Sequence, residues 1–376
     1  MSNNTLHKLG IDIGSTTVKV AVLDENDNLL FSDYERHFAN IRETLSLLVE
    51  KAYKQLGDMQ IAPMITGSGG LTLAKHLDVP FVQEVISVST ALQHYAPQTD
   101  VAIELGGEDA KIIYFEGGNV EQRMNGICAG GTGSFIDQMS ILLKTDADGL
   151  NALAENHTII YPIAARCGVF AKSDVQPLLN EGAAREDIAA SILQAVVTQT
   201  ISGLAQGRPI KGNIVFLGGP LHFLPQLRRQ FEETLKDNAK SFKTPENAQL
   251  FVAIGAALMY EDKTSDIDTL ISQLANAKSV DAEITRMRKL FETEEERKEF
   301  FDRHGKDVAR RKDISTANGP VFLGLDVGST TIKAALINED GDILYDYYGK
   351  NEGSPITCGI KILRELYSKL PKSAYI

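Results

Sequence analysis

The stretch LGIDIGSTTVKVAVLD, from Leu9 to Asp24, reads as an apolar strand, a glycine turn and a second apolar strand. Asp12 lies near the end of the first strand, where a carboxylate can hold a magnesium-bound water, and Lys19 adds a positive charge. The turn offers backbone N–H and hydroxyl donors to a phosphate from Gly14, Ser15, Thr16 and Thr17. We therefore predict a nucleotide-phosphate loop with Asp12 as a catalytic residue; a plain β-hairpin is the alternative.

The same pattern recurs late in the chain. LGLDVGSTTIKAALIN, from Leu323 to Asn338, is nearly identical to the first stretch and repeats its polar residues at Asp326, Gly328 and Lys333. A repeat of this kind changes the domain count. Residues 319–376 are too few for the later elements of a whole domain, so we interpret them as a truncated second copy. On this view the chain is the N-terminal part of a longer protein, or the second copy is degenerate.

Strands, glycine turns and helices alternate along much of the 376 residues, which is typical of an α/β protein. Residues 1–262 are long enough for a complete domain with a substantial core. After them, a helical period of apolar residues continues amid dense charge. We therefore expect 263–318 to form a solvated helical linker before the partial copy.

A second glycine pair follows the strand in IELGGEDAK. Glu104 and Glu108 flank Gly106 and Gly107, which places a carboxylate where it could orient water for attack on a γ-phosphate. Glu104 is therefore our second catalytic candidate, and the other three are expected to contact the nucleotide. A further strand, in IVFLGGP, leads to residues that could pack against adenine or ribose: Gly218, Gly219 and Pro220.

A cysteine stands before another glycine-rich turn in NGICAGGTGSFIDQM, Asn125 to Met139. The glycines allow successive N–H groups to point at an anion at a helix N-terminus, so we expect nucleotide contacts from Gly130, Gly131 and Thr132. The same positive field favours the thiolate of Cys128, as a metal ligand requires. A structural turn beside a buried free cysteine is the alternative.

Together, LGIDIGSTTVK, IELGGEDAK and IVFLGGP resemble the phosphate and adenosine signatures of the actin, sugar-kinase and heat-shock-chaperone ATPases. Two cysteine-containing stretches make the resemblance specific to one family within this superfamily: NGICAGGTGSFIDQM, and IAARCGVFAKSDVQPLLNEG from Ile163 to Gly182. Over about residues 8–260 the chain is similar to the CoA-substrate-specific enzyme activases. These are ATP-dependent activators of 2-hydroxyacyl-CoA dehydratases, related to the ATPase subunits of benzoyl-CoA reductases.

The resemblance implies a two-lobed, ribonuclease-H-like (actin-like ATPase) fold with ATP and Mg²⁺ between the lobes. The lobes would be about 1–98 with a C-terminal helix at 248–262, and 99–247. The sequence departs from the family pattern in its second loop, where the family usually has an aspartate and a glutamine. Here the corresponding residues are Glu104 and Glu108.

Two cysteines are candidate ligands for an iron–sulfur cluster. Cys128 and Cys167 are too far apart for a CxxC site, and two thiolates cannot complete the usual four-cysteine ligation of a 4Fe–4S cluster. A two-fold dimer would supply four, which is what the resemblance implies, and a second copy in a longer chain could supply them instead. Cys358, in the partial copy, is not expected to be a ligand. Two unrelated buried cysteines are the alternative.

The formal net charge of −12 argues against a nucleic-acid partner, which normally needs a basic surface. The N-terminus MSNNTLHKLG lacks an apolar signal core, and no run of about 18 apolar residues occurs. We therefore expect a cytoplasmic protein without a membrane span. Three scattered cysteines do not make a disulfide framework.

Our leading hypothesis, from the resemblance, is a reductive activator. It would hydrolyse MgATP and pass a low-potential electron from its 4Fe–4S cluster to a partner iron–sulfur dehydratase or reductase. A ferredoxin- or flavodoxin-type protein would supply the electron. A small-molecule kinase without a cluster, and a non-redox, nucleotide-gated scaffold, are the alternatives.

Overall fold

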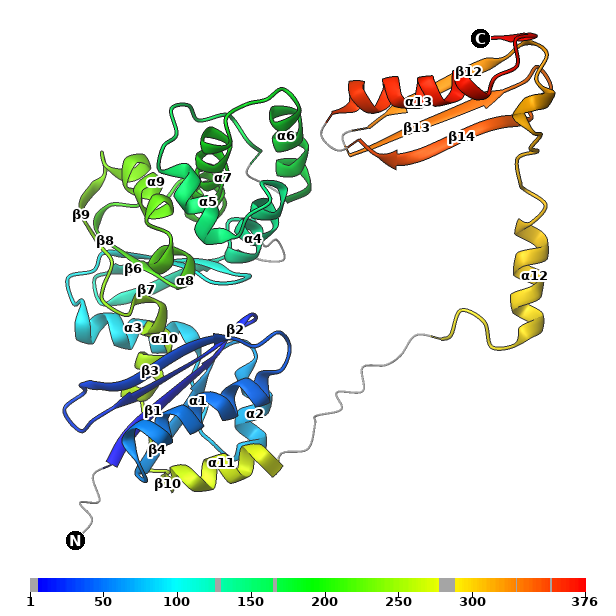
Figure 1. The fold of residues 1–376 in the computed structure, drawn as a ribbon. Coiled ribbons are helices and arrows are strands. Elements are labelled where there is room, and N and C mark those ends of the chain that lie inside the picture. The colour runs from blue at the N-terminus through cyan, green and yellow to red at the C-terminus, as the bar shows by residue number, and fades with distance from the viewer. Residues whose placement is uncertain (1–5, 126–129, 165–167, 277–287, 329, 352–353) are drawn as a thin grey trace. The chain divides into compact units, whose positions relative to one another are not determined.

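The computed structural model describes residues 6–125, 130–164, 168–276, 288–328, 330–351 and 354–376. The chain divides into two units. Unit 1 consists of residues 1–175 and 183–278, and unit 2 of residues 176–182 and 279–376. Unit 1 contains two lobes, each built on its own five-stranded sheet (Figure 1).

The sheet of the first lobe has the strand order β10-β4-β1-β2-β3. Strands β1, β2 and β3 form an antiparallel meander, and β4 joins β1 in parallel. The last five residues of β1 and the last six of β4 are buried without alternation, because both faces of the sheet are covered. The strand bounds are β1 Leu6–Ile13, β2 Thr17–Leu23, β3 Leu29–Arg36, β4 Gln60–Thr66 and β10 Ser265–Asp266.

The second lobe repeats this arrangement. Its sheet has the order β7-β6-β5-β8-β9, with an antiparallel meander β5-β6-β7 and a parallel neighbour β8 beside β5. The strands are β5 Val101–Leu105, β6 Ala110–Glu116, β7 Asn119–Met124, β8 Gly212–Leu217 and β9 Ala239–Lys243. The helices of this lobe are α4 Gly133–Leu142, α5 Ala147–Ala154, α6 Gly168–Asn180, α7 Arg185–Thr200, α8 Gly219–Phe223 and α9 Pro225–Leu235.

Two helices lie between the sheets of the two lobes: α3 Glu84–Tyr95 and α10 Phe251–Leu258 (Figure 1). They share a buried core with residues from both sheets. The backbones approach closely, because a Cβ on Gly255 of α10 would overlap the carbonyl of Ser87 in α3. A Cβ on Gly10 of β1 would likewise overlap the carbonyl of Ala253. Small residues thus let α10 pack directly against the first lobe.

The first lobe extends further along the chain than the sequence analysis predicted. Strand β10 pairs with β4, and the following helix, α11 Ile267–Asn276, buries Ile267, Leu270 and Leu274 in the core of the lobe. The beginning of the predicted linker, 263–318, is therefore structural, because its apolar stripe is covered rather than solvated. The same core is covered by α1 Ile41–Leu56 and α2 Gly70–Leu77.

The helix α7, extended by a π-helical turn at Ile201–Ala205, is long and apolar enough to cross a membrane by length and composition. Most of its residues are buried inside the second lobe. The core helix of a globular lobe has the same composition, so the burial accounts for the apolar sequence.

Unit 2 contains a three-stranded antiparallel sheet in the order β12-β13-β14. Its elements are α12 Glu294–His304, β11 Gly319–Pro320, β12 Phe322–Val327, β13 Thr331–Ile337, β14 Ile343–Lys350, α13 Pro355–Lys369 and β15 Ala374–Tyr375. Asp326 lies opposite Lys333 in the strand register, and the two form a 2.8 Å ion pair. This hairpin has the geometry described below for the first lobe. That 319–376 are the start of a second domain stays a prediction.

Candidate functional site

The first hairpin, β1-β2, joins Asp12 to Lys19. The two residues are opposite each other in the strand register, and Lys19 Nζ lies 2.5 Å from Asp12 Oδ2. Asp12 is 2% exposed. Burial of Lys19 opposes its charge, but the Asp12 carboxylate raises the pKa of Lys19 above its ordinary value. The first loop therefore presents a fixed acid–lysine pair.

The turn between these strands is held closed from two sides. The Gly14 N–H donates to the Thr17 carbonyl at 2.9 Å, and His37 Nε2 lies 3.2 Å from the Gly14 carbonyl. The His37 N–H also donates to the Thr16 carbonyl at 3.1 Å. Sequence analysis did not single out His37, since a lone histidine after a strand carries no signal of its own.

The second hairpin, β5-β6, repeats the pairing with Glu104 and Lys111. They are opposite each other in register, and Lys111 Nζ lies 3.7 Å from Glu104 Oε1. Among the described side chains, the buried Glu104 Oε2 has no hydrogen-bond partner. Burial raises the pKa of Glu104 to about 7, against the influence of the nearby Lys111 charge. The acid and the lysine are seven residues apart in both hairpins, a signal in the sequence that could have identified Lys111.

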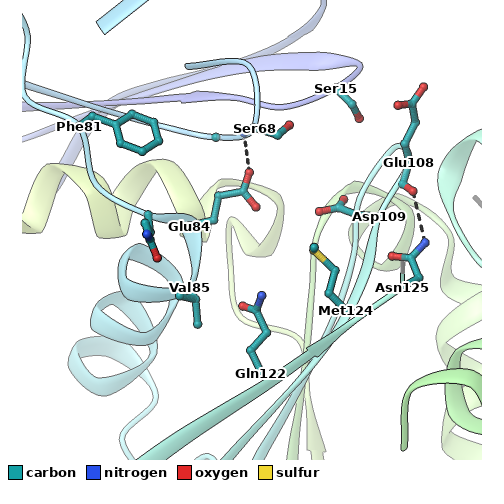
Figure 2. Close-up of a pocket in the computed structure, with 12 residues that line it drawn as sticks. Ser15, Ser68, Phe81, Glu84, Val85, Glu108, Asp109, Gln122, Met124 and Asn125 are labelled. Atoms are coloured by element: carbon teal, nitrogen blue, oxygen red, sulfur yellow. Dashed lines mark hydrogen bonds between the residues drawn. The ribbon is translucent and has the colours of Figure 1, made fainter. Parts of the chain in front are cut away.

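Lys111 also contacts two further carboxylates. Its Nζ lies 2.7 Å from Asp109 Oδ2 in the same turn and 2.6 Å from Glu84 Oε2, at the start of α3. The other oxygen of Glu84 accepts the Ser68 N–H at 2.9 Å, from the loop after β4 (Figure 2). The sequence analysis named none of these four residues as part of the site.

The two hairpins meet around a cavity of about 30 Å³ between the lobes. Its lining includes most of the predicted residues of the first two loops: Asp12, Gly14, Ser15, Thr16, Thr17, Lys19, Glu104, Gly106 and Gly107. Four carboxylates and two lysines line the cavity, counting Glu84, Asp109 and Lys111. Each of these carboxylates forms an ion pair with one of the two lysines, and the described residues contain no group of three or more acidic, histidine or cysteine side chains arranged to hold a metal ion.

Glu108 lies apart from this cavity. Its side chain lines an adjoining cavity of about 680 Å³, together with Ser15, Glu84 and Asn125 (Figure 2). Asn125 Nδ2 donates to the Glu108 carbonyl at 3.4 Å. The prediction that Glu108 contacts the nucleotide stays open, but its carboxylate is not among the lining groups of the small cavity.

The third loop is joined to the second hairpin at the start of α4. The N–H groups of Gly133 and Ser134 donate to the carbonyls of Gly106 and Gly107, at 3.0 Å and 2.7 Å. These two donors are therefore engaged within the lobe rather than directed at an anion. Of the predicted contacts, Gly130, Gly131 and Thr132 are buried, and none of the three lines the small cavity.

The fourth loop borders a cavity of about 440 Å³. Gly219 and Pro220 line it, and Gly218 takes a positive φ of 88° at the turn before them. Aromatic rings from both lobes lie beside it, with Tyr34 and Phe223 in edge contact at 5.7 Å between ring centroids. A flat, partly apolar lining of this kind suits a nucleoside.

The two candidate cluster ligands, Cys128 and Cys167, lie outside the described residues. The helices that follow them are described. Gly168, the first residue of α6, lies beside α4, since a Cβ on it would stand 3.5 Å from Gln138 Oε1 and 3.7 Å from Phe135 Cδ2. The start of α6 therefore lies beside the first part of α4.

Comparison with known proteins places the chain in a family. The model of the BadF/BadG/BcrA/BcrD ATPase family matches residues 9–259. The chain belongs to this family. Characterised homologues within the family are 2-hydroxyacyl-CoA dehydratase activators of the actin-like ATPase superfamily, so the predicted resemblance is confirmed.

Two curated relatives are similar over most of their length. The (R)-2-hydroxyglutaryl-CoA dehydratase activating ATPase of Acidaminococcus fermentans is 30% identical over 258 residues, 68% of this chain and 96% of that protein. The 2-hydroxyisocaproyl-CoA dehydratase activator of Clostridioides difficile is 28% identical over 267 residues, 69% of this chain and 97% of that protein.

Two solved structures of such activators have the same fold. The Acidaminococcus fermentans component A aligns with a TM-score of 0.61 at 28% identity, covering 72% of this chain and all of that one. The Clostridium difficile activator with bound ADPNP aligns with a TM-score of 0.58 at 25% identity, covering 75% of this chain and all of that one. The predicted α/β, actin-like ATPase fold is therefore confirmed for this BadF/BadG/BcrA/BcrD family member.

Proposed function

We propose that this protein is an ATP-driven reductive activator that passes a low-potential electron from a 4Fe–4S cluster to a partner iron–sulfur dehydratase or reductase. The observation that carries the proposal is the pair of facing acid–lysine hairpins in a chain of the activator family. The relatives named as dehydratase activators support such a partner. A ferredoxin- or flavodoxin-type donor would supply the electron, in the cytoplasm.

ATP would lie along the three neighbouring loops. Its phosphates would bind the turn after Asp12 and the Lys19 ammonium, and its nucleoside would lie at the cavity beside Pro220 and Phe223. Asp12 would hold a water bound to Mg²⁺, which neutralises phosphate charge. Backbone N–H groups of the turn and the Lys19 ammonium would receive the phosphates once the small cavity opens.

Glu104 would orient the attacking water. Its Oε2 is buried and lacks a partner among the described groups, so it is available to accept a proton. Water attacks the γ-phosphorus, the bond from that phosphorus to the bridging oxygen of ADP breaks, and the water proton passes to Glu104 Oε2. A pKa raised to about 7 suits a carboxylate that both accepts and returns a proton near neutral pH.

The cluster would be held by Cys128 and Cys167 of two copies, a role that rests on the sequence and the family. The adjacent starts of α4 and α6 support it, because each cysteine precedes one of these helices. A cluster in that position would supply a one-electron carrier whose potential is tuned by its charge and its hydrogen bonds.

ATP hydrolysis can reach the cysteine segment through the backbone. The hydrogen bonds from Gly133 and Ser134 to the second hairpin join the γ-phosphate loop to α4, the helix that follows Cys128. A shift of the hairpin when the γ-phosphate leaves would therefore pull on that helix. This contact would serve as the two-state element that the coupling requires.

The proposal is tested by anaerobic purification followed by iron and sulfide analysis and an ATPase assay. We expect about four iron atoms per dimer, as one shared 4Fe–4S cluster requires. We also expect ATP turnover. Cys128→Ala should lose the iron and its absorbance, whereas Cys358→Ala should retain both. Cys358 is the matched control because it lies in α13, with its Sγ 3.3 Å from the Asn351 carbonyl. Iron retained in Cys128→Ala would refute the ligand assignment.

A small-molecule kinase is the second candidate, favoured by the cavity of about 680 Å³ that adjoins the small cavity and is large enough for an acceptor. Gln83, Gln122 and Asn125 could hydrogen-bond a hydroxylated acceptor there. A kinase would show ATP turnover that depends on an added sugar or acid and no dependence on iron. Turnover without an acceptor favours the activator.

A further inference from the structure

Lys111 occupies an unusual position for a lysine, almost fully buried at the boundary of the two lobes. Its side chain is 4% exposed, and its ammonium group contacts carboxylates from three places in the fold. Glu104 is on β5, Asp109 is in the hairpin turn, and Glu84 is on α3 of the first lobe. Because desolvation of the lysine is costly, only several carboxylates together can keep it charged. Burial opposes the charge, but these carboxylates raise the pKa of Lys111 well above its ordinary value.

We propose that Lys111 is a positioning residue for ATP hydrolysis, which holds the Glu104 carboxylate across the second hairpin while Glu84 of the first lobe anchors the lysine. The inference rests on the proposed function and deepens its account of the same site. Lys111 reaches Glu104 through one oxygen only, at 3.7 Å from Oε1. The other oxygen, Oε2, has no hydrogen-bond partner in the described part of the chain and would face the water.

The anchor on the first lobe makes this arrangement depend on the position of the lobes. Glu84 binds Lys111 with one oxygen. Its other oxygen accepts the Ser68 N–H (Figure 2), so the carboxylate is fixed at both ends. If α3 moves relative to the second hairpin, Lys111 loses a partner at 2.6 Å and is free to move closer to Glu104. Lobe closure would thereby set the charge that Glu104 experiences.

The groups around Glu104 predict opposite effects for two substitutions. Burial raises its pKa most, Lys111 and Lys19 lower it, and Asp109 and Glu84 raise it. Removing the charge of Lys111 should therefore raise the pKa of Glu104, and removing the charge of Glu84 should lower it. A substitution that only damages the fold would not shift the pKa of Glu104 in these two opposite directions.

The experiment compares Lys111→Met, Lys111→Arg and Glu84→Gln with the wild-type chain. Two readouts are used: the carboxyl NMR titration of Glu104, assigned by its loss in Glu104→Gln, and the pH profile of ATP turnover. We expect Lys111→Met to lower kcat about 10- to 100-fold with less than about a threefold change in KM for ATP, as for a misplaced catalytic group. The midpoint of the Glu104 titration and the acid limb of the pH profile should both move to higher pH in Lys111→Met. Both should move to lower pH in Glu84→Gln. Lys111→Arg should restore the wild-type position.

The matched control is Lys51→Met. Lys51 also contacts two carboxylates, with its Nζ 2.8 Å from Asp33 and 3.0 Å from Glu35. Both carboxylates are on β3, and none of these three residues lines the small cavity. Lys51→Met should leave ATP turnover and the Glu104 titration unchanged. Wild-type turnover with an unmoved Glu104 titration in Lys111→Met would overturn this inference alone. A wild-type chain that does not turn over ATP at any pH would refute the proposed function, and with it the role of Lys111 in hydrolysis.

Discussion

Gly107 of the second lobe lies directly against Thr16 of the first. A Cβ on Gly107 would overlap Thr16 Oγ1 and would stand 2.8 Å from its Cγ2 and 2.9 Å from its Cβ. Rotation of the threonine side chain cannot relieve this overlap, because the threonine Cβ itself is too close. The glycine is therefore required by the approach of the two phosphate loops and not by an unusual backbone angle.

Gly107→Ala should hold the lobes apart. We expect the affinity for a non-hydrolysable ATP analogue to fall about tenfold or more, since misplacing the loops by about 1 Å is enough for a loss of this size. The free energy of unfolding should change little, because the strain is released by opening. Isothermal titration calorimetry measures the affinity. Gly324→Ala is the control, with its nearest neighbour 3.9 Å from the new Cβ; equal affinities in both variants would contradict the prediction.

Asp12→Asn should abolish most ATP turnover. The substitution removes the carboxylate that pairs with Lys19 and would hold the magnesium-bound water, so we expect kcat to fall by about 100-fold or more. Steady-state ATPase kinetics provide the test. The repeat offers a matched control, because Asp326→Asn breaks the same ion pair in unit 2, where Asp326 is exposed. Turnover that survives in Asp12→Asn would remove this residue from the mechanism.

Glu104 should make the protein less stable as the pH rises. Its pKa is about 7 in the folded chain and ordinarily 4.5, so the folded state binds more protons than the unfolded state between these values. The free energy of unfolding therefore decreases from about pH 4.5 to pH 7, by about 3 kcal/mol from this group. Glu104→Gln cannot ionise and should show a smaller fall in Tm between about pH 5 and pH 8. An identical pH dependence in both proteins would show that Glu104 titrates normally.

Leu270→Ala should destabilise unit 1 by about 2 to 4 kcal/mol, because it empties a site in the core that α11 shares with the first lobe. Chemical denaturation followed by circular dichroism measures the effect. Leu290→Ala is the control, since Leu290 is 83% exposed and its truncation should cost less than about 0.5 kcal/mol. If Leu270→Ala changed the free energy of unfolding as little as the control does, α11 would be part of the linker and not of the core.

Gly255→Ala should also destabilise unit 1. The new methyl group would overlap the backbone carbonyl of Ser87, which no side-chain rotation can move, so α3 and α10 must separate. We expect a loss of about 3 kcal/mol or more. Gly203→Ala should be tolerated, because its Cβ would meet Gln199 Nε2 at 3.4 Å only. Thermal unfolding of the pair gives the comparison, and similar Tm values would rule out close helix packing at Gly255.

The sequence alone determined the local part of the site. An antiparallel hairpin fixes its own register, so the order of strand, turn and strand was enough to predict that Asp12 and Lys19 belong to one loop. The same reasoning applied to IELGGEDAK would have paired Glu104 with Lys111. These contacts need only a few residues of chain, and the motifs carried the family resemblance for the same reason.

Only the tertiary structure decided which distant elements complete the site and the core. Glu84 reaches Lys111 because the packing of α3 brings its first residue against the second hairpin. His37 reaches the loop at Gly14 because the β2-β3 register pairs Thr17 with Arg36. The apolar stripe of α11 illustrates the limit most clearly: periodicity identified a helix, but a stripe does not say what covers it. A pattern along the chain records which face is apolar, whereas its partner is selected by the packing of the whole lobe.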